Sequence, residues 1–278
     1  MGMADDLDLY DLRARPAPQR DAECLQFYED VYGPSFPDPA IREEVDTWLE
    51  LLAVEPVPPR PRLHVIVAAE RDRRVGGASR IRAGFVCEYY ARSGAALGTY
   101  LAVAPDVRRR GLARRLVELG RQVLAADAGR PGGTGPVLFA ETEKPDRSAH
   151  ESPTDVAARL SALARLGFLR SELPYVQPPL GPGKPPVDRM LLLVHGPSLA
   201  GPAADGAAPG APAAVSPWLV ESFLRDFYES LGAAPDRSPA FQAMRRWLAA
   251  RDPVPLLPLA PLIPVAPTAA RAAEPPRG

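Results

Sequence analysis

Residues 100–129 read YLAVAPDVRRRGLARRLVELGRQVLAADAG. Residues 99–104 are mostly apolar and β-prone, and Pro105 ends this run as proline ends strands. Three arginines follow, and after Gly111 leucine and valine recur at helical spacing over residues 112–124. The segment therefore predicts a strand, a tight basic turn and an amphipathic helix.

The predicted turn has the features of an anion-binding site. The first N–H groups of a helix have no intrahelical acceptor, and the positive end of the helix dipole points outward. Gly111 and the small Ala113 let an anion approach the backbone closely. The sequence therefore predicts that a phosphate group binds at this turn.

The same residues resemble the acetyl-CoA signature of the GNAT N-acetyltransferase superfamily, whose core is Arg/Gln-x-x-Gly-x-Gly/Ala. Arg108, Gly111 and Ala113 take its three places, and a Val-x-Pro run precedes them. The resemblance implies that the turn holds the CoA pyrophosphate and that the strand offers backbone groups to the pantetheine and the thioester. The implied acetyl-CoA-binding residues are Leu101, Ala102, Val103, Arg108, Arg109, Arg110, Gly111, Leu112, Ala113 and Arg114.

The order of the predicted elements also resembles that of a GNAT domain. Strands are expected at residues 7–12, 64–69, 75–90, 95–104, 137–140, 175–182 and 187–195, and helices at residues 21–32, 38–52, 112–124 and 155–166. Asp21 and Asp38 are the expected caps of the first two helices, Gly33 and Pro34 the end of the first, and residues 71–74 a turn. The implied fold class is α/β, with a mixed, mostly antiparallel central sheet flanked by helices.

The composition along the chain predicts four segments. Residues 1–196 form the GNAT-like domain, and the Ala/Gly/Pro-rich residues 197–215 read as a linker. Residues 216–250 predict two helices that echo the first two, since Phe27-Tyr28-Glu29 recurs as Phe227-Tyr228-Glu229. Residues 251–278 are a proline-rich tail, expected to be extended or disordered. Two short helices cannot bury their apolar stripes alone, so they should dock on the main domain or on a second chain in a homodimer.

Acetyl transfer to an amine requires a base for the ammonium and a proton for the departing thiolate. GNAT proteins often supply that proton from a tyrosine one helical turn before a Gly-Phe pair. Here the Gly-Phe pair is Gly167-Phe168, but Leu163 takes the tyrosine's place. Tyr175, Tyr89 or Tyr90 could substitute, or the proton could come from solvent.

Three glutamates are candidates for the base. Glu141 and Glu143 follow the strand next to the signature strand, where the cleft of a GNAT fold lies, and Glu88 ends the long middle strand. Each is also consistent with a solvated charge at a strand end. The resemblance places the acceptor wall in the first helices and their loop, at Tyr32, Ser35 and Phe36, and Tyr89 is expected to contribute.

Composition excludes several other classes of protein. The formal charge of the 278-residue chain is -1, so the local arginine cluster fits a small phosphate ligand better than nucleic acid. Two cysteines and three scattered histidines provide neither a disulfide framework nor metal-ligand spacing. No apolar run is long enough for a membrane span and no signal peptide is evident, so a cytoplasmic protein is expected.

The sequence thus supports two hypotheses of different kinds. The first is an acetyl-CoA-dependent N-acetyltransferase that transfers the acetyl group directly, in a ternary complex, to a small amine or an amino group of a peptide. The alternative is a non-catalytic CoA-binding sensor or scaffold module, which the missing tyrosine and the additional helices would suit.

Overall fold

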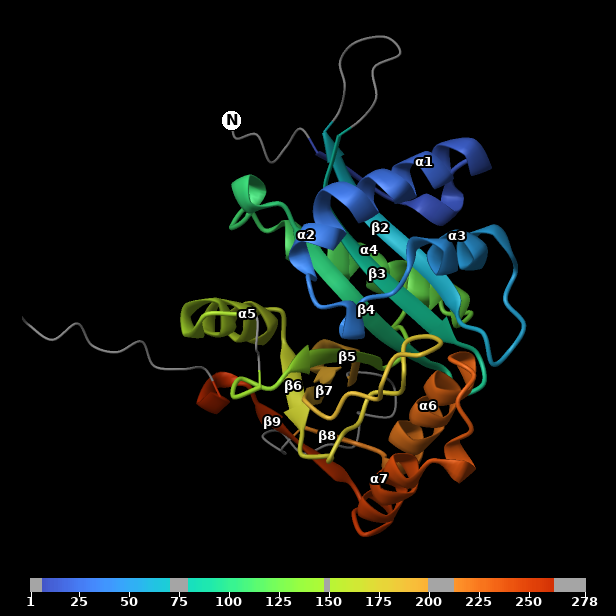
Figure 1. Cartoon of the computed structure of the whole chain (residues 1–278), viewed down its shortest axis with the longest axis vertical. Coiled ribbons are helices and arrows are strands. Elements are labelled where there is room, and N and C mark those ends of the chain that lie inside the picture. The colour runs from blue at the N-terminus through green and yellow to red at the C-terminus, as the bar shows by residue number, and fades with distance from the viewer. Residues whose placement is uncertain (1–6, 71–79, 148–150, 200–212, 263–278) are drawn as a thin grey trace, which may run out of the picture.

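A computed structural model describes residues 7–70, 80–147, 151–199 and 213–262. Within these ranges the strands form one sheet in the order β1-β2-β3-β4-β5-β7-β6-β9-β8. Their bounds are β1 Leu7–Asp11, β2 Arg62–Glu70, β3 Arg80–Tyr90, β4 Ala95–Val103, β5 Leu138–Glu143, β6 Phe168–Ser171, β7 Met190–His195, β8 Ala214–Val215 and β9 Val254–Pro258. Among the described strands, β4 and β5 are the one pair that runs parallel. This confirms the predicted fold class, a mixed and mostly antiparallel sheet flanked by helices (Figure 1).

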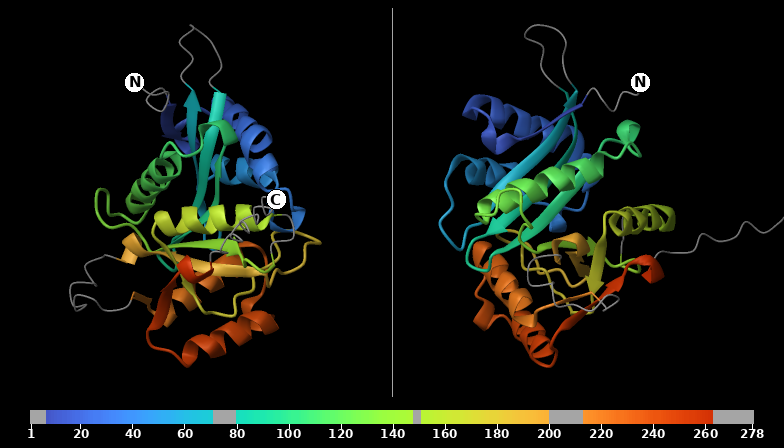
Figure 2. Two further views of the ribbon diagram at one scale, coloured as in Figure 1. Left: turned by 90° about the vertical axis from the view of Figure 1, so that its left-hand side faces the viewer. Right: turned by 180° about the vertical axis from the view of Figure 1, so that it is seen from behind.

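Helices cover both faces of the sheet. α1 (Ala17–Phe27) and α3 (Val45–Ala53) pack on one face of β2, β3 and β4, and α4 (Leu112–Asp127) packs on the opposite face (Figures 1 and 2). α5 (Pro153–Arg165) lies on the α4 side. A glycine brings α4 close to the sheet: a Cβ on Gly120 would lie 2.6 Å from the ring of Phe85 on β3. This contact positions the start of α4 beside the end of β4.

The first helices differ from their predicted bounds. α1 begins at Ala17 after Pro16, so Asp21 lies inside the helix and does not cap it. The chain continues through a π-helical turn, Tyr28–Tyr32, and α2 (Gly33–Ser35), past the predicted end. Packing explains the continuation, because the rings of Tyr28 and Tyr32 both lie against Trp48. Asp38 does act as a cap, but only of a 3-10 turn, Pro39–Ile41.

The end of the domain differs more. The predicted strand at residues 175–182 is reduced to a single bridge between Gln177 and Val187, and β6, which was not predicted, takes the place in the sheet. β5 also continues through Glu143, past its predicted end. β9 comes from the proline-rich tail and pairs with both β6 and β8. Its two prolines concealed it, since proline cannot donate a ladder hydrogen bond and argues against a central strand. Residues 71–74, predicted to form a turn, lie outside the described residues.

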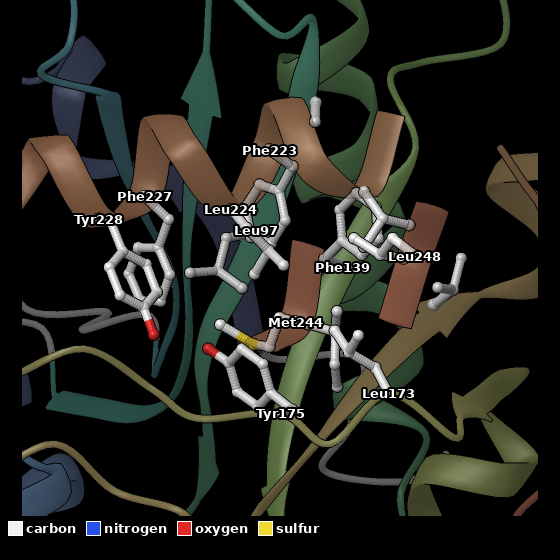
Figure 3. Close-up of a cluster of buried hydrophobic side chains, with 14 of the residues drawn as sticks. Leu97, Phe139, Leu173, Tyr175, Phe223, Leu224, Phe227, Tyr228, Met244 and Leu248 are labelled. Carbon is white, nitrogen blue, oxygen red and sulfur yellow. The ribbon is translucent and has the colours of Figure 1, made fainter. Parts of the chain in front are cut away.

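The two C-terminal helices pack on the sheet of their own chain. α6 (Pro217–Ser230) lays Phe223 on Phe139 of β5, with ring centroids 4.3 Å apart and planes at 6° (Figure 3). The buried carboxylate of Asp226 accepts a hydrogen bond from the Ser93 N–H at 2.8 Å. α7 (Pro239–Ala249) adds Met244 and other side chains to the same apolar cluster. The apolar stripes of both helices are therefore buried within one chain.

A buried histidine links the sheet to helix α4. His64 of β2 contacts Asp11 of β1 through Nδ1 at 2.6 Å and Asp127 of α4 through Nε2 at 2.7 Å. Burial lowers the pKa of His64, but the hydrogen bonds to the two carboxylates outweigh it and raise that pKa to about 9. The imidazolium is therefore the form that the fold stabilises at neutral pH.

We expect His64→Gln to destabilise the protein by about 3 kcal/mol near pH 6, because it removes the imidazolium that lies between two partly buried carboxylates. A histidine whose pKa is raised on folding contributes its stability fully below its unfolded pKa, near 6.5, and loses it as pH rises through about 9. The difference between variant and wild type should therefore shrink at pH 10. Chemical denaturation at both pH values measures it, and an equal difference at both would contradict a charged His64.

Candidate active site

The parallel strands β4 and β5 separate along their length. Ala96–Gly98 pairs with Leu138–Ala140, but β4 continues to Val103 and β5 continues to Glu143. A bulge accompanies the separation: Val86 pairs with Tyr100 and Cys87 with Gly98, which leaves Thr99 as the extra residue of β4. The hydroxyl oxygen of Thr99 is buried and has no hydrogen-bond partner. The separation therefore exposes polar backbone of β4 beside a polar side chain whose hydrogen bonds are unsatisfied.

The predicted basic turn lies at the end of β4. Arg109 and Gly111 have left-handed φ values of 63° and 75°, and Gly111 is the N-cap of α4 without a side-chain cap. A Cβ added to Gly111 would meet nothing within 4 Å, so open space faces its backbone. The side chains of Arg108 and Arg110 donate hydrogen bonds to the Val103 and Asp106 carbonyls at 2.9 and 3.1 Å, which hold the turn in place.

The implied acetyl-CoA residues thus lie on one continuous path. Leu101, Ala102 and Val103 form the part of β4 beyond its pairing with β5, and the path continues through the turn into the first residues of α4, Leu112, Ala113 and Arg114. Arg108, Arg109, Arg110 and Arg114 are exposed. The path therefore combines an open strand edge, free helix N–H groups and positive charge.

Glu141 and Tyr175, predicted separately, are brought together. Glu141 follows Ala140, the last residue of β5 that pairs with β4. Its Oε1 accepts a hydrogen bond from the Tyr175 hydroxyl, and its Oε2 accepts one from the Gln177 side chain at 2.9 Å. Burial raises the pKa of Glu141 to about 7, although both hydrogen bonds lower it. Two hydrogen bonds therefore fix the position of the Glu141 carboxyl group, and its pKa lies near neutrality.

Two further carboxylates face the same side of the sheet. Glu88 pairs with Leu97 on β4, and Leu97 pairs with Phe139 on β5, so Glu88 and Glu141 share a face. Burial and the nearby charge of Glu43 raise the pKa of Glu88 to about 8, while a hydrogen bond from Tyr90 opposes the rise. Burial also raises the pKa of Glu43, which lies just before α3.

The third candidate base has a different environment. Glu143 accepts a hydrogen bond from Arg189 at 2.7 Å, and the same guanidinium contacts Asp38. The negative charge of Glu143 is therefore already neutralised by an ion pair. This arrangement suits a structural link between β5 and the turn at Asp38 better than proton transfer.

The predicted acceptor residues lie on two different faces of the sheet. Tyr32 is fully buried among aromatic rings and accepts a hydrogen bond from the Glu43 N–H at 2.9 Å. Phe36 packs its ring on Tyr32, and Ser35 donates to the Val31 carbonyl. Tyr89 lies on the opposite face of β3 from Glu88, because neighbouring strand residues point to opposite sides. Tyr32 and Phe36 therefore support the wall beside Glu43, while Tyr89 lies away from it.

Sequence reasoning missed Glu43 and Gln177. Glu43 stands in a charged segment, Arg42-Glu43-Glu44, that reads as solvated, yet its side chain is buried and accepts a hydrogen bond from Trp48 Nε1 at 2.6 Å. Gln177 lies between β6 and β7, where a loop residue gives no sign of its partner. Among the described residues, no group of three or more histidine, cysteine or acidic side chains could hold a metal ion.

No protein-family model matches this chain, and no curated protein matches it either. Solved structures do. A GNAT-family protein from Bacteroides thetaiotaomicron is 20% identical, with 63% of this chain and 81% of that one covered and a TM-score of 0.43. The tandem GNAT protein of the clavulanic acid pathway is 21% identical, with 62% of this chain and 46% of that one covered and a TM-score of 0.43.

A third structure, from Elizabethkingia anophelis with acetyl-CoA bound, is 14% identical. The match covers 68% of this chain and 97% of that one, with a TM-score of 0.36. All three are GNAT-family proteins. This chain spans less than half of the tandem protein. No helix in its described ranges is long and apolar enough to cross a membrane.

Proposed function

We propose that this chain is an acetyl-CoA-dependent N-acetyltransferase, which passes the acetyl group directly to the amine of a small molecule or a peptide. The observation that carries the proposal is the position of Glu141. Its carboxyl group titrates near pH 7 and lies where β4 and β5 part, on a strand next to the one that leads into the basic turn.

The residues of the turn and of β4 fit acetyl-CoA. Gly111 leaves open space above its backbone, which any side chain would fill, and the N–H groups that begin α4 have no intrahelical acceptors. The exposed arginines supply positive charge for phosphates. The edge of β4 beyond its pairing with β5 can bond the amides and carbonyls of an extended pantetheine. When bound, acetyl-CoA supplies an activated acetyl thioester.

The chain's own residues supply the proton chemistry. With a pKa of about 7, Glu141 is partly ionised at neutral pH and can accept a proton from an ammonium, directly or through a water. Burial and the neighbouring Glu141 carboxylate raise the pKa of Tyr175 well above its usual value, so Oη keeps its proton. The protons balance if Glu141 takes one from the ammonium while Tyr175 gives its hydroxyl proton to the departing thiolate and receives the one on Glu141.

The location of the chain is part of the proposal. Cys24 and Cys87 are both buried free thiols, and their free state fits a reducing cytoplasm. Burial raises the pKa of the Cys24 thiol to about 12, so it is not a nucleophile at neutral pH. Burial also raises the pKa of the Cys87 thiol well above its usual value, and two protonated thiols support direct transfer over a covalent cysteine intermediate.

Release of free CoA thiol from acetyl-CoA, with a panel of primary amines and with none, tests the proposal. We expect release that depends on the amine and saturates with its concentration. Tight acetyl-CoA binding in calorimetry without release by any amine would instead support the non-catalytic sensor or scaffold.

A further inference from the structure

A cavity of about 120 Å³ lies between α3, the end of β3 and α6. Glu43 and Glu88 line it together with Tyr90, Phe227, Ser230 and Leu231. Arg60 and Glu50 also line it and form an ion pair at 2.7 Å with largely exposed side chains. The cavity thus combines two carboxylates and an aromatic and aliphatic wall with an exposed ion pair.

The two carboxylates are buried, and among the described residues neither forms an ion pair, although the charge of Lys184 acts on Glu43 from a distance. Glu43 is 6% exposed and Glu88 is 4% exposed. Tyr90 donates to one oxygen of Glu88 and Trp48 donates to one oxygen of Glu43, and both donors are neutral. No described lysine or arginine forms an ion pair with either carboxylate, and Lys184 instead donates to the Arg42 carbonyl and to Glu44. Each carboxylate therefore accepts a hydrogen bond from a neutral donor and lines a cavity that a ligand can fill.

We propose that this cavity binds the acceptor, a small primary alkylamine whose ammonium contacts Glu43 and Glu88. The inference rests on the proposed function and names its substrate class. Burial raises the pKa of both carboxyl groups, and an ammonium favours their ionised forms by offsetting the cost of the buried charge, which a neutral or anionic ligand cannot do. The volume is close to that of protein cavities that hold a benzene-sized body, so a short apolar chain fits against Phe227 and Leu231.

The proposal gives α6 a direct role in specificity. Phe227, Ser230 and Leu231 lie at its C-terminal end. Three contacts fix the helix: Phe223 on Phe139, the Asp226 carboxylate with the Ser93 N–H, and the Tyr228 hydroxyl with the Val176 carbonyl at 2.7 Å. The end of α6 therefore completes the acceptor pocket that Glu43 and α3 begin.

Calorimetry with n-butylamine and 1-butanol, without acetyl-CoA and at pH 8.5, tests the site. An alkylamine is still charged there, since its pKa lies near that of lysine, about 10.4. We expect butylamine to bind at least about tenfold more tightly than butanol, because only the amine carries the cation that the carboxylates lack. Glu88→Gln should remove most of that difference, and its amide keeps the shape of the side chain.

Glu221→Gln is the matched control, because Glu221 lies on α6, pairs with Arg245 at 3.1 Å and is not part of the cavity lining. Equal binding of amine and alcohol, or an unchanged Glu88→Gln variant, would overturn the inference. Thermal melts and acetyl-CoA affinity establish that each variant folds. If butylamine binding depends on Glu88 but butylamine causes no thiol release, the binding site is supported and the proposed acetyltransferase function is contradicted. If butylamine causes thiol release and its KM is the same in Glu88→Gln as in wild type, the function is supported and the proposed site is contradicted.

Discussion

Gly111→Glu is expected to lose most of the affinity for acetyl-CoA while the protein stays folded. The residue begins α4 with a φ of 75°, and its backbone faces open space. A carboxylate there would repel a pyrophosphate bound at the turn, and a repulsion of roughly 2 kcal/mol, which two charges about 5 Å apart can reach at a protein surface, is about a 30-fold loss. Calorimetric titration with acetyl-CoA measures the change.

Gly111→Gln is the matched control, since it carries the same bulk and the same backbone strain without the charge. It should bind more weakly than wild type but clearly better than Gly111→Glu, and the gap should narrow at high salt because salt screens exposed charges. If both variants kept wild-type affinity, the pyrophosphate would have to bind elsewhere, and the assignment of the turn would be wrong.

The parts of the fold predicted best are those that local sequence determines. The strand at residues 95–104 and the helix that follows Gly111 were predicted within a few residues, because proline, glycine and a regular apolar stripe mark their bounds. The start of α7 carries an equally local signal, because Ser238 caps it by accepting a hydrogen bond from the Phe241 N–H. Each of these signals lies within a few residues of the feature that it specifies.

The parts that were missed depend on contacts between distant segments. Tyr32 and Trp48 hold the chain helical past Gly33, which in isolation reads as a helix end. β9 forms because it pairs with β6 and β8, although its own sequence contains Pro255 and Pro258. Tertiary packing overrides local preference in both cases.

The candidate site shows the same division. The glutamates at 88, 141 and 143 were all predicted as bases, but the sequence could not rank them. Burial raises the pKa of Glu88 and Glu141, whereas Glu143 forms an ion pair with Arg189. Arg189 lies 46 residues further along the chain, so the sequence near Glu143 does not reveal this partner. Glu43 was missed because its burial depends on Trp48 and on the aromatic cluster around it. Solvation and ion pairing, which decide the chemistry of a carboxyl group, are properties of the folded chain.

Glu141→Gln is expected to lower kcat/KM for an amine about 100-fold or more, because it removes the group that accepts the ammonium proton. In the wild-type enzyme kcat/KM should rise with pH through an apparent pKa of about 7, since Glu141 acts only when ionised and burial raises its pKa to that value. The variant should lose this acidic limb and keep its affinity for acetyl-CoA. Initial rates of thiol release from pH 5.5 to 9 provide both measurements.

Glu143→Gln is the control for this experiment, since it changes the same charge two residues along β5. It should keep the acidic limb, because Glu143 is paired with Arg189 and is not the proton acceptor. Tyr175→Phe should shift the limb to higher pH, because the Tyr175 hydroxyl donates to Glu141 and so favours the ionised carboxylate. An unchanged limb in Glu141→Gln, or its loss in Glu143→Gln alone, would move the base away from Glu141. The Tyr175 variant adds a second test, since a limb that belongs to Glu141 must move when the hydrogen bond to its Oε1 is removed.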